Sequence, residues 1–440
     1  MLLSIEKLVY GGDGLARIAG ADGRSMAVFV PFVLPGEKVE VELAQEKLGT
    51  TKGFARASVS RIVEPSPERV AAACPYFEQC GGCHYQQIDY ERQLEFKAQI
   101  LRETFERVGK IRLTEEIRLH RSPPWNYRNR TRFQVRTAPQ FALGYYRMGS
   151  REFLPVRECP ISSPLINRAL GEIADRGGLD CPAAIEEIEL FADASDERML
   201  GWAFCAGDAK EKDLHRWAAA VRRELPALAG LSFFSSRQFS SRQRAEDEAA
   251  DLKLLAQSGE TTICYRTARG EYRVSAGAFF QVNRHLVDEL VAVVVGDAGG
   301  EIAIDLYAGV GLFSVPMGKM FRHIFAVEAS HTSIRDLKHN ASANVKVVGA
   351  RTDDYLRSGA VRKRPSLIIL DPPRTGAGKA IIRSLIEIGA QRIHYVACDP
   401  ATLARDLAPL LAAGYRIEEA HLFDLFPQTF HVETVMLLTR

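Results

Sequence analysis

The carboxy-terminal part of the chain contains the stretch Ile304-Asp305-Leu306-Tyr307-Ala308-Gly309-Val310-Gly311. Its first residues are typical of a buried strand, and its Gly-x-Gly turn leads into a helical stretch. Glycines at 309 and 311 let the backbone approach a bound molecule, and the Asp305 carboxylate can accept a hydrogen bond from it. A lone turn of this kind also fits an ordinary strand-to-helix connection, so the neighbouring strands decide between the two interpretations.

Further apolar runs follow, each separated from the next by a helical stretch: 324–327, 367–370 and 393–397. This alternation predicts a doubly wound, Rossmann-like α/β domain with a parallel sheet and helices on both faces. The runs end at Glu328, Asp371 and Cys398, and the carboxyl ends of parallel strands face one crevice, so these residues should converge with Asp305. Because no third phosphate-binding glycine follows, S-adenosylmethionine is a better expectation than NAD.

Two residues near this crevice are candidates for chemistry. Cys398 precedes Asp399, a predicted N-cap, and Pro400, a predicted first helical residue, so its thiol should lie where a helix amino terminus favours thiolate. The alternative is a small buried thiol, but a nucleophile is the stronger interpretation. Glu433 begins a terminal apolar strand, and its local sequence alone indicates an exposed carboxylate.

The rest of the chain divides into two more regions. Residues 1–62 show short β patterns separated by turns, which suits a small OB-like barrel. Residues 63–267 mix strands and helices, including a helical stretch from about Tyr90 to Val108, and predict a central α+β domain. Residues 235–260 are polar and charged, and suit a helix or an exposed connection. The catalytic domain would then span 268–440.

Four cysteines of the middle region form a candidate metal site. Cys74, Cys80 and Cys83 share a short loop, and Cys159 is a plausible fourth ligand. Close thiolates bind zinc or an iron–sulfur cluster, and the spacing does not separate these two. The remaining cysteines suit structural positions: Cys181, Cys205 and Cys264.

The stretch from Arg121 to Arg151 is a candidate RNA surface. It contains no acidic residue, and its arginines alternate with aromatic residues, the pattern of a single-stranded RNA surface. The alternative is a solvated basic face with its aromatic residues in the core. The arginines are 121, 128, 130, 132, 136, 147 and 151, and the aromatic residues are Trp125, Tyr127, Phe133, Phe141, Tyr145 and Tyr146.

Composition narrows the class of protein. The 440 residues are 46% hydrophobic and 25% charged, as in folded globular chains, and the net charge of +2 means that any RNA surface must be local. No apolar run of membrane-spanning length and no signal peptide is evident. We therefore expect a cytoplasmic monomer without a membrane or obligate protein partner. Eight cysteines are too few for a disulfide scaffold.

Five motifs in order carry a family resemblance. They are Phe279-Phe280-Gln281-Val282-Asn283, the stretch from Asp305 to Gly311, Asp371-Pro372-Pro373-Arg374-Thr375-Gly376, Cys398-Asp399-Pro400-Ala401-Thr402-Leu403-Ala404-Arg405-Asp406 and Phe426-Pro427-Gln428-Thr429-Phe430-His431-Val432-Glu433. Together they resemble the RNA 5-methyluridine methyltransferase family, and residues 1–62 resemble its RNA-binding TRAM domain. Three positions depart from the usual family pattern: Ala308, Leu312 and Asp399.

The resemblance assigns roles to individual residues. It implies that Cys398 is the nucleophile and Glu433 the base. It also implies a [4Fe-4S] cluster on Cys74, Cys80, Cys83 and Cys159, and S-adenosylmethionine contacts from Gln281, Tyr307, Glu328, Asp353 and Asp371. Relatives with both the TRAM domain and the cysteines mostly modify large-subunit rRNA, so 23S rRNA is favoured over tRNA.

The chemistry explains these residue types. Carbon 5 of uracil attacks a sulfonium methyl only after a thiolate adds to carbon 6, and a base must then remove the carbon 5 proton. Two rivals remain, which are a cytosine C5 methyltransferase and a catalytically inactive iron–sulfur protein that binds RNA.

Overall fold

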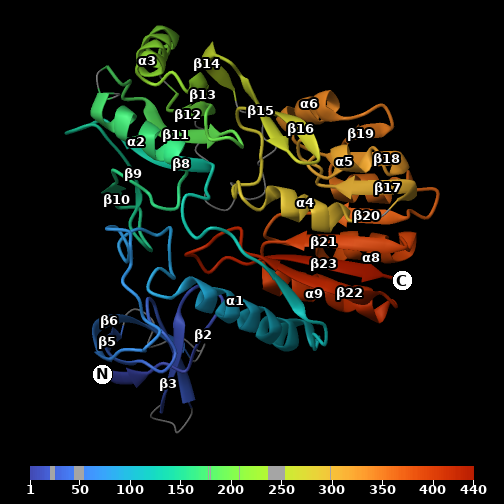
Figure 1. Ribbon diagram of the computed structural model, residues 1–440, viewed down its shortest axis with the longest axis horizontal. Coiled ribbons are helices and arrows are strands. Elements are labelled where there is room, and N and C mark those ends of the chain that lie inside the picture. The colour runs from blue at the N-terminus through green and yellow to red at the C-terminus, as the bar shows by residue number, and fades with distance from the viewer. Residues whose placement is uncertain are drawn as a thin grey trace.

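The computed structural model describes residues 1–19, 25–43, 54–176, 178, 180–207, 209–235, 253–297 and 299–440. Most of the polar segment 235–260 lies outside these residues. Figure 1 shows the largest sheet and its helices on one side of the molecule, with the two other large sheets one above the other on the opposite side.

The largest sheet has eight strands in the order β19-β18-β17-β20-β21-β23-β22-β7. The first five strands are parallel, which confirms the predicted parallel sheet. β23 then lies antiparallel between β21 and β22, and β7 adds a parallel edge strand. The strands are β7 (Ile117–His120), β17 (Gly300–Leu306), β18 (Phe321–Glu328), β19 (Val345–Gly349), β20 (Leu367–Leu370), β21 (Arg392–Ala397), β22 (Arg416–Phe423) and β23 (Glu433–Thr439).

Helices cover both faces of this sheet, because its strands are apolar on both sides. In β17, Ala303 packs into one core while Ile304 and Leu306 pack into the other. The first core takes α4 (Val287–Val295), α5 (Ser314–Met317) and α6 (His331–Asn340). The second takes α1 (Tyr90–Thr104), the π-helical turn η2 (Phe105–Gly109), α7 (Thr352–Arg357), α8 (Gly378–Ile388) and α9 (Pro400–Ala412).

Residues 90–120 pack with the carboxy-terminal sheet although they lie far from it in sequence. The helix predicted from about Tyr90 to Val108 is confirmed as α1 and η2, and its Leu101 and Phe105 are fully buried in the second core. β7 pairs with β22 through Ile117 and Ala420. The predicted domain boundaries near residues 63 and 267 stay a prediction. The region 63–267 nevertheless supplies helix α1 and edge strand β7 to the catalytic sheet.

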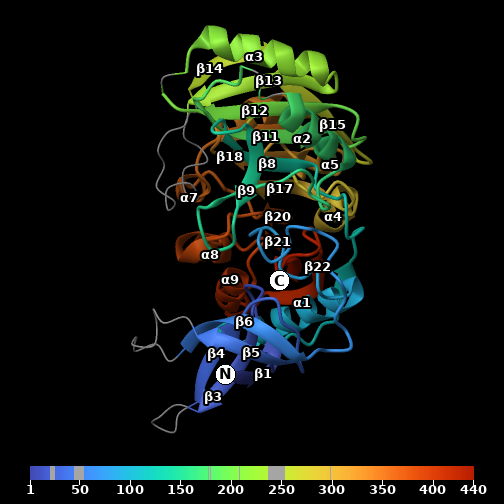
Figure 2. The same cartoon turned by 90° about the vertical axis from the view of Figure 1, so that its left-hand side faces the viewer.

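The middle region forms a seven-stranded sheet in the order β10-β9-β8-β11-β12-β13-β14. Helices α2 (Pro164–Arg176) and α3 (Glu211–Glu224) bury their apolar faces in its core. Figure 2 shows both helices beside this sheet at the top of the molecule. The strands are β8 (Arg130–Arg136), β9 (Ala142–Tyr146), β10 (Phe153–Pro155), β11 (Ile185–Ala192), β12 (Met199–Cys205), β13 (Leu228–Ser235) and β14 (Leu254–Gly259), and a separate hairpin follows as β15 (Thr262–Thr267) and β16 (Gly270–Ser275).

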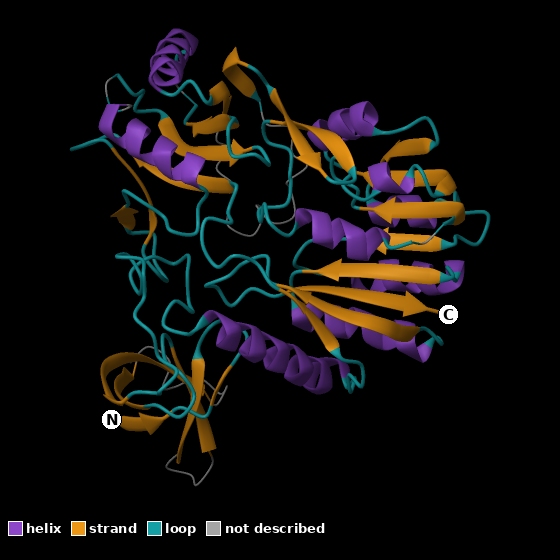
Figure 3. Cartoon of the chain, viewed as in Figure 1, coloured by secondary structure: helices purple, strands orange, loops and turns teal. Residues whose placement is uncertain are grey.

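The amino-terminal region is a six-stranded sheet with its own small apolar core. Figure 3 shows it as a compact unit of strands beside the amino terminus of α1. Its identification as a TRAM-type barrel stays a prediction. Among the described residues no helix is long and apolar enough to cross a membrane. The strands are β1 (Leu2–Ser4), β2 (Lys7–Leu8), β3 (Gly14–Ala19), β4 (Ser25–Val30), β5 (Lys38–Leu43) and β6 (Phe54–Glu64).

Candidate active site

Acidic side chains gather at the carboxyl ends of the parallel strands. Burial, together with the negative charges of Asp371 and Glu328, raises the pKa of Asp305, at the end of β17, to about 7. Burial likewise raises the pKa of Asp371 to about 7. Charges influence each other in this way only over short distances. The predicted convergence of these strand ends is therefore confirmed.

Cys398 lies between β21 and α9. The predicted helix start is confirmed, because the Asp399 carboxylate accepts hydrogen bonds from the amides of Ala401 (3.0 Å) and Thr402 (2.8 Å), and Pro400 is the first helical residue. The predicted thiolate-favouring environment is wrong. Burial raises the pKa of the Cys398 thiol to about 12. The carboxylates of Glu433, Asp371 and Asp399 raise this pKa further towards that value. Among the main contributors, only the Arg374 guanidinium lowers it.

Glu433 is buried beside the thiol, so the exposed carboxylate indicated by its local sequence is wrong. Its strand β23 runs antiparallel to β21, and Ala397 pairs with Thr434. The residues that flank this pair at the same edge of the sheet are Cys398 and Glu433. The Glu433 side chain is only 6% exposed, and burial followed by the Asp371 charge raises its pKa well above the usual value.

The glycine turn leaves space for a ligand. Gly309 has a φ of 55°, and a Cβ at that position would meet no atom within 4 Å. The Glu328 carboxylate accepts hydrogen bonds from the amides of Gly309 (2.8 Å), Ala329 (2.8 Å) and Ser330 (2.7 Å), and so braces the turn. One oxygen of Asp305 accepts from the Ser314 hydroxyl, while Oδ1 is buried without a partner.

The other predicted cofactor residues lie around this turn or near it. Tyr307 has a φ of 63°, and burial raises its pKa to about 12. Asp353, at the start of α7, forms ion pairs with Arg351 (3.4 Å) and Arg357 (3.1 Å). Gln281 is buried, and the next residue, Val282, accepts from the Asn129 amide at 2.9 Å, which ties this segment to the middle sheet. Gly311 has a φ of 99°, which strains any residue with a side chain, and a Cβ there would lie 2.7 Å from Leu337 Cδ1, so Leu337 would have to shift.

The loop that leads to Glu433 is anchored by residues that the sequence did not single out. Lys97 of α1 and Asp424 form a fully buried ion pair at 2.6 Å, and Lys97 also donates to the Phe426 carbonyl at 3.1 Å. Gln93 and Gln428 exchange two hydrogen bonds of 3.0 Å. The sequence did offer one signal for this anchor, because Gln93 and Lys97 are polar residues one turn apart on the apolar face of a predicted helix.

The four candidate metal ligands lie close enough to one another that the charge of one thiol raises the pKa of others. Burial raises the pKa of Cys80 to about 11 and of Cys83 to about 12, and raises that of Cys74 too, with Cys159 contributing in all three cases. No three His, Cys, Asp or Glu side chains of the described part of the chain are arranged as a metal site. The thiols are thus gathered but not in a coordination geometry. Four cysteine side chains remain a donor set that suits a soft metal.

The arginine-rich stretch is less free than its sequence suggests. Acids from elsewhere pair with Arg121 (Glu91, 3.1 Å) and with both Arg130 and Arg132 (Glu189). Arg147 also pairs with Glu152 at 3.0 Å. Tyr127 and Phe133 are fully buried and Tyr146 is exposed. The stretch thus mixes core aromatics with arginines of which four are paired with acids, and its role as an RNA surface stays a prediction.

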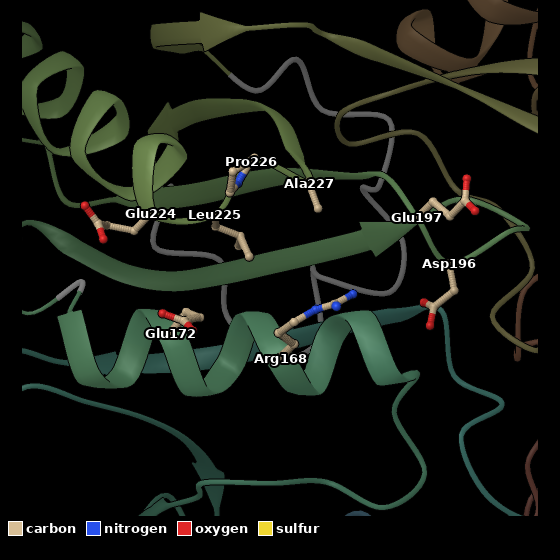
Figure 4. Close-up of a pocket in the computed structure, with 8 residues that line it drawn as sticks. All are labelled: Arg168, Glu172, Asp196, Glu197, Glu224, Leu225, Pro226 and Ala227. Atoms are coloured by element: carbon tan, nitrogen blue, oxygen red, sulfur yellow. The ribbon is translucent and has the colours of Figure 1, made fainter.

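A cavity of about 410 Å³ lies away from the strand ends. Figure 4 shows that Arg168 and Glu172 of α2, Asp196 and Glu197 of the turn after β11, and the residues from Glu224 to Ala227 at the end of α3 line it. It does not contain the residues of the candidate active site.

Comparison with known proteins agrees with this site. The tRNA (Uracil-5-)-methyltransferase family model matches residues 260–440. An uncharacterized RNA methyltransferase of Aquifex aeolicus is 31% identical over 443 residues, which is 99% of this chain and 97% of that protein. The 23S rRNA (uracil(1939)-C(5))-methyltransferase RlmD of Chromohalobacter salexigens is 32% identical over 100% of this chain and 89% of its own length.

Among solved structures, the tRNA (uracil-54, C5)-methyltransferase of Pyrococcus abyssi, in complex with S-adenosyl-L-homocysteine, has a TM-score of 0.74 over the whole of both chains. At 23% identity this likeness shows a shared fold. The relatives at 31% and 32% identity, matched over 97% and 89% of their own length, show that this protein belongs to the RNA (uracil-5-)-methyltransferase family.

Proposed function

We propose that the enzyme methylates carbon 5 of one uridine in RNA through a covalent adduct between Cys398 and carbon 6. The observation that carries this proposal is the pairing of Ala397 with Thr434, which sets the thiol and the Glu433 carboxyl side by side at the edge where the glycine turn opens. A thiol, a carboxyl and a cofactor space at one edge are what this two-stage reaction requires.

The raised pKa values define the proton transfers. The Cys398 thiol must lose its proton before it adds to carbon 6, and the nearby Arg374 guanidinium favours the thiolate. Methyl transfer from the sulfonium then leaves an extra proton on carbon 5. A buried carboxylate with a raised pKa is a strong base once ionised, so Glu433 takes this proton, the thiolate leaves carbon 6, and the aromatic ring is restored.

S-adenosylmethionine would occupy the space at the glycine turn. Two observations fit it, which are the open space at Gly309 and the buried Asp305 Oδ1 without a partner. The remaining proposed contacts are Gln281, Tyr307, Gly311, Glu328, Asp353 and Asp371. The cofactor supplies the methyl group, and these residues bind and orient it.

We also propose that Cys74, Cys80, Cys83 and Cys159 hold a [4Fe-4S] cluster. The chemistry of four gathered thiols supports a soft metal centre, and methyl transfer needs no redox change. The cluster would cross-link the loop 74–83 to the middle sheet and thereby stabilise the fold and the RNA-binding surface, to which residues 1–62 would contribute.

For the substrate we favour 23S rRNA, with tRNA second and a cytosine C5 reaction third. The supporting observation is the 32% identity, over the whole of this chain, to an enzyme whose name gives 23S rRNA as its substrate. An inactive RNA-binding role is disfavoured because the chain retains Cys398, Glu433 and Asp371 at one buried edge.

Cys398→Ala tests the proposed function. The variant should bind S-adenosylmethionine normally, yet neither methylate RNA nor form an adduct with 5-fluorouridine RNA. Cys264→Ala, which removes an exposed thiol from hairpin β15-β16, is the matched control and should behave like the wild type. Mapping 5-methyluridine in rRNA and tRNA from cells with and without the gene identifies the substrate. Turnover by Cys398→Ala at the wild-type rate would contradict the mechanism.

A further inference from the structure

The amino-terminal region reaches the candidate active site through one side chain. Tyr10 lies in the turn between β2 and β3, and its hydroxyl donates to the backbone carbonyl of Cys398 at 3.3 Å. Its ring meets the ring of Phe430 edge-on, with the centroids 5.5 Å apart. Tyr10 thus contacts the peptide of the proposed nucleophile and the loop that leads to the proposed base.

The turn that presents Tyr10 is held firmly. The Val9 amide donates to Asp13 O at 3.0 Å, and the Gly12 amide donates to Val9 O at 3.2 Å. A Cβ at Gly12 would lie 3.0 Å from the side chain of His84, so the turn packs closely on the chain that follows the cysteine loop. The His84 ring also meets Phe430 edge-on, at 4.7 Å, so Tyr10 and His84 both fix that ring.

Tyr10 is also built into two apolar cores. It packs against the core shared by α1, α9 and the catalytic sheet, and against a small core that contains Leu8, Tyr85 and Phe96. Burial, followed by the negative charge of Asp399, raises the pKa of its phenol. The hydroxyl group is therefore a donor throughout the physiological pH range.

We propose that Tyr10 is a positioning residue for methyl transfer, through which the amino-terminal region fixes the Cys398 peptide and the Phe430 loop relative to each other. This inference rests on the proposed roles of Cys398 and Glu433. The hydroxyl group and the ring of Tyr10 act separately. The hydroxyl group holds the nucleophile, and the ring holds the loop before the base.

Two variants separate the two parts. Tyr10→Phe removes only the hydroxyl group, so adduct formation with saturating 5-fluorouridine RNA should slow about tenfold, which is the upper end of the effect of one hydrogen bond. The RNA concentration for half-saturation should stay the same. Tyr10→Leu also removes the ring contact, so with ordinary uridine RNA the adduct should persist longer than in Tyr10→Phe, because the loop before Glu433 is less well held.

Tyr415→Phe is the matched control. Its hydroxyl group also donates to a backbone carbonyl, that of Ala390 at 2.8 Å, but at the opposite end of β21. This variant should lose some stability and keep the wild-type rate of adduct formation.

Wild-type adduct formation in Tyr10→Phe would overturn the inference. So would a change confined to RNA half-saturation, because Tyr10 would then act only in RNA binding. Equal slowing in Tyr10→Phe and Tyr415→Phe would show a general loss of stability and would also overturn it. Failure of the proposed function itself is seen separately, as methylation by Cys398→Ala.

Discussion

The buried ion pair between Lys97 and Asp424 should carry a large part of the stability of the active-site loop. Both side chains are 0% exposed, and Lys97 Nζ lies 2.6 Å from Asp424 Oδ1. Lys97→Met removes the cation and keeps most of the apolar stem, so it leaves a buried carboxylate without its ion-pair partner, and the other carboxylate oxygen, Asp424 Oδ2, has no hydrogen-bond partner to offset the loss. An uncompensated buried charge of this kind costs about 3–5 kcal/mol.

A second variant tests whether the charge is the cause. In Lys97→Met with Asp424→Asn both charges are absent, and only an uncharged amide remains buried. The loss should therefore fall to about 1–2 kcal/mol. Lys38→Met is the control, since it breaks an ion pair with Glu64 whose side chains are 45% and 60% exposed, and it should cost less than about 1 kcal/mol.

The assay is urea denaturation, with the free energy of unfolding compared among these variants. Adduct accumulation is measured in parallel, because a looser 424–431 segment should slow elimination more than addition. If Asp424→Asn fails to rescue Lys97→Met, the cost comes from lost packing and the reasoning about the buried charge is refuted.

Three more predictions concern single residues. Glu433→Gln keeps the volume but removes the proton acceptor, so a covalent enzyme–RNA species should accumulate with ordinary uridine RNA in denaturing electrophoresis, and its absence at normal cofactor affinity would exclude Glu433 as the base. Cys74→Ser should abolish the visible absorbance of iron and sulfide in anaerobically purified protein, whereas a colourless, zinc-loaded and fully active wild type would refute the cluster. Because the pKa of Asp305 is raised to about 7, this carboxyl group stabilises the fold most below pH 4, and its contribution is lost as the pH rises through 7. The unfolding free energy of the wild type should therefore fall between pH 4 and pH 7. In Asp305→Asn this fall should be smaller by roughly 2–4 kcal/mol. An unchanged pH dependence in urea titrations would contradict the burial of an ionisable carboxyl at this position.

Much of the catalytic sheet was predictable because its strands are buried on both faces. Such strands are continuous apolar runs between helices, and the predicted run 367–370 coincides with β20. The glycine turn after β17 was equally clear. These features depend on neighbouring residues, which a single sequence displays.

The sequence could not show which distant segments meet. β7 joins the catalytic sheet from residues 117–120, and β23 enters antiparallel between β21 and β22. The burial of Glu433 follows from that strand order, so its local sequence pointed the wrong way. The same limit explains the arginine-rich stretch, since Glu189 pairs with Arg130 and Arg132 from a neighbouring strand more than fifty residues away. The environment of Cys398 also depends on Glu433 and Asp371, which lie on other elements and which the helix start after Cys398 does not reveal.

The loop before Glu433 connects the proposed cluster to the proposed chemistry. The Gln428 carbonyl accepts from the amides of His84 (2.9 Å) and Tyr85 (3.0 Å), which directly follow Cys83, and Gln428 itself has a φ of 68°. A residue held in this uncommon conformation depends on its surroundings. Cys398 is instead held by the cap of α9. Loss of the cysteine loop should therefore disturb the base before the nucleophile, and Cys74→Ser should prolong the covalent adduct more than it slows adduct formation. Equal slowing of both steps would mean that the cysteine loop acts on the whole fold and not on this segment.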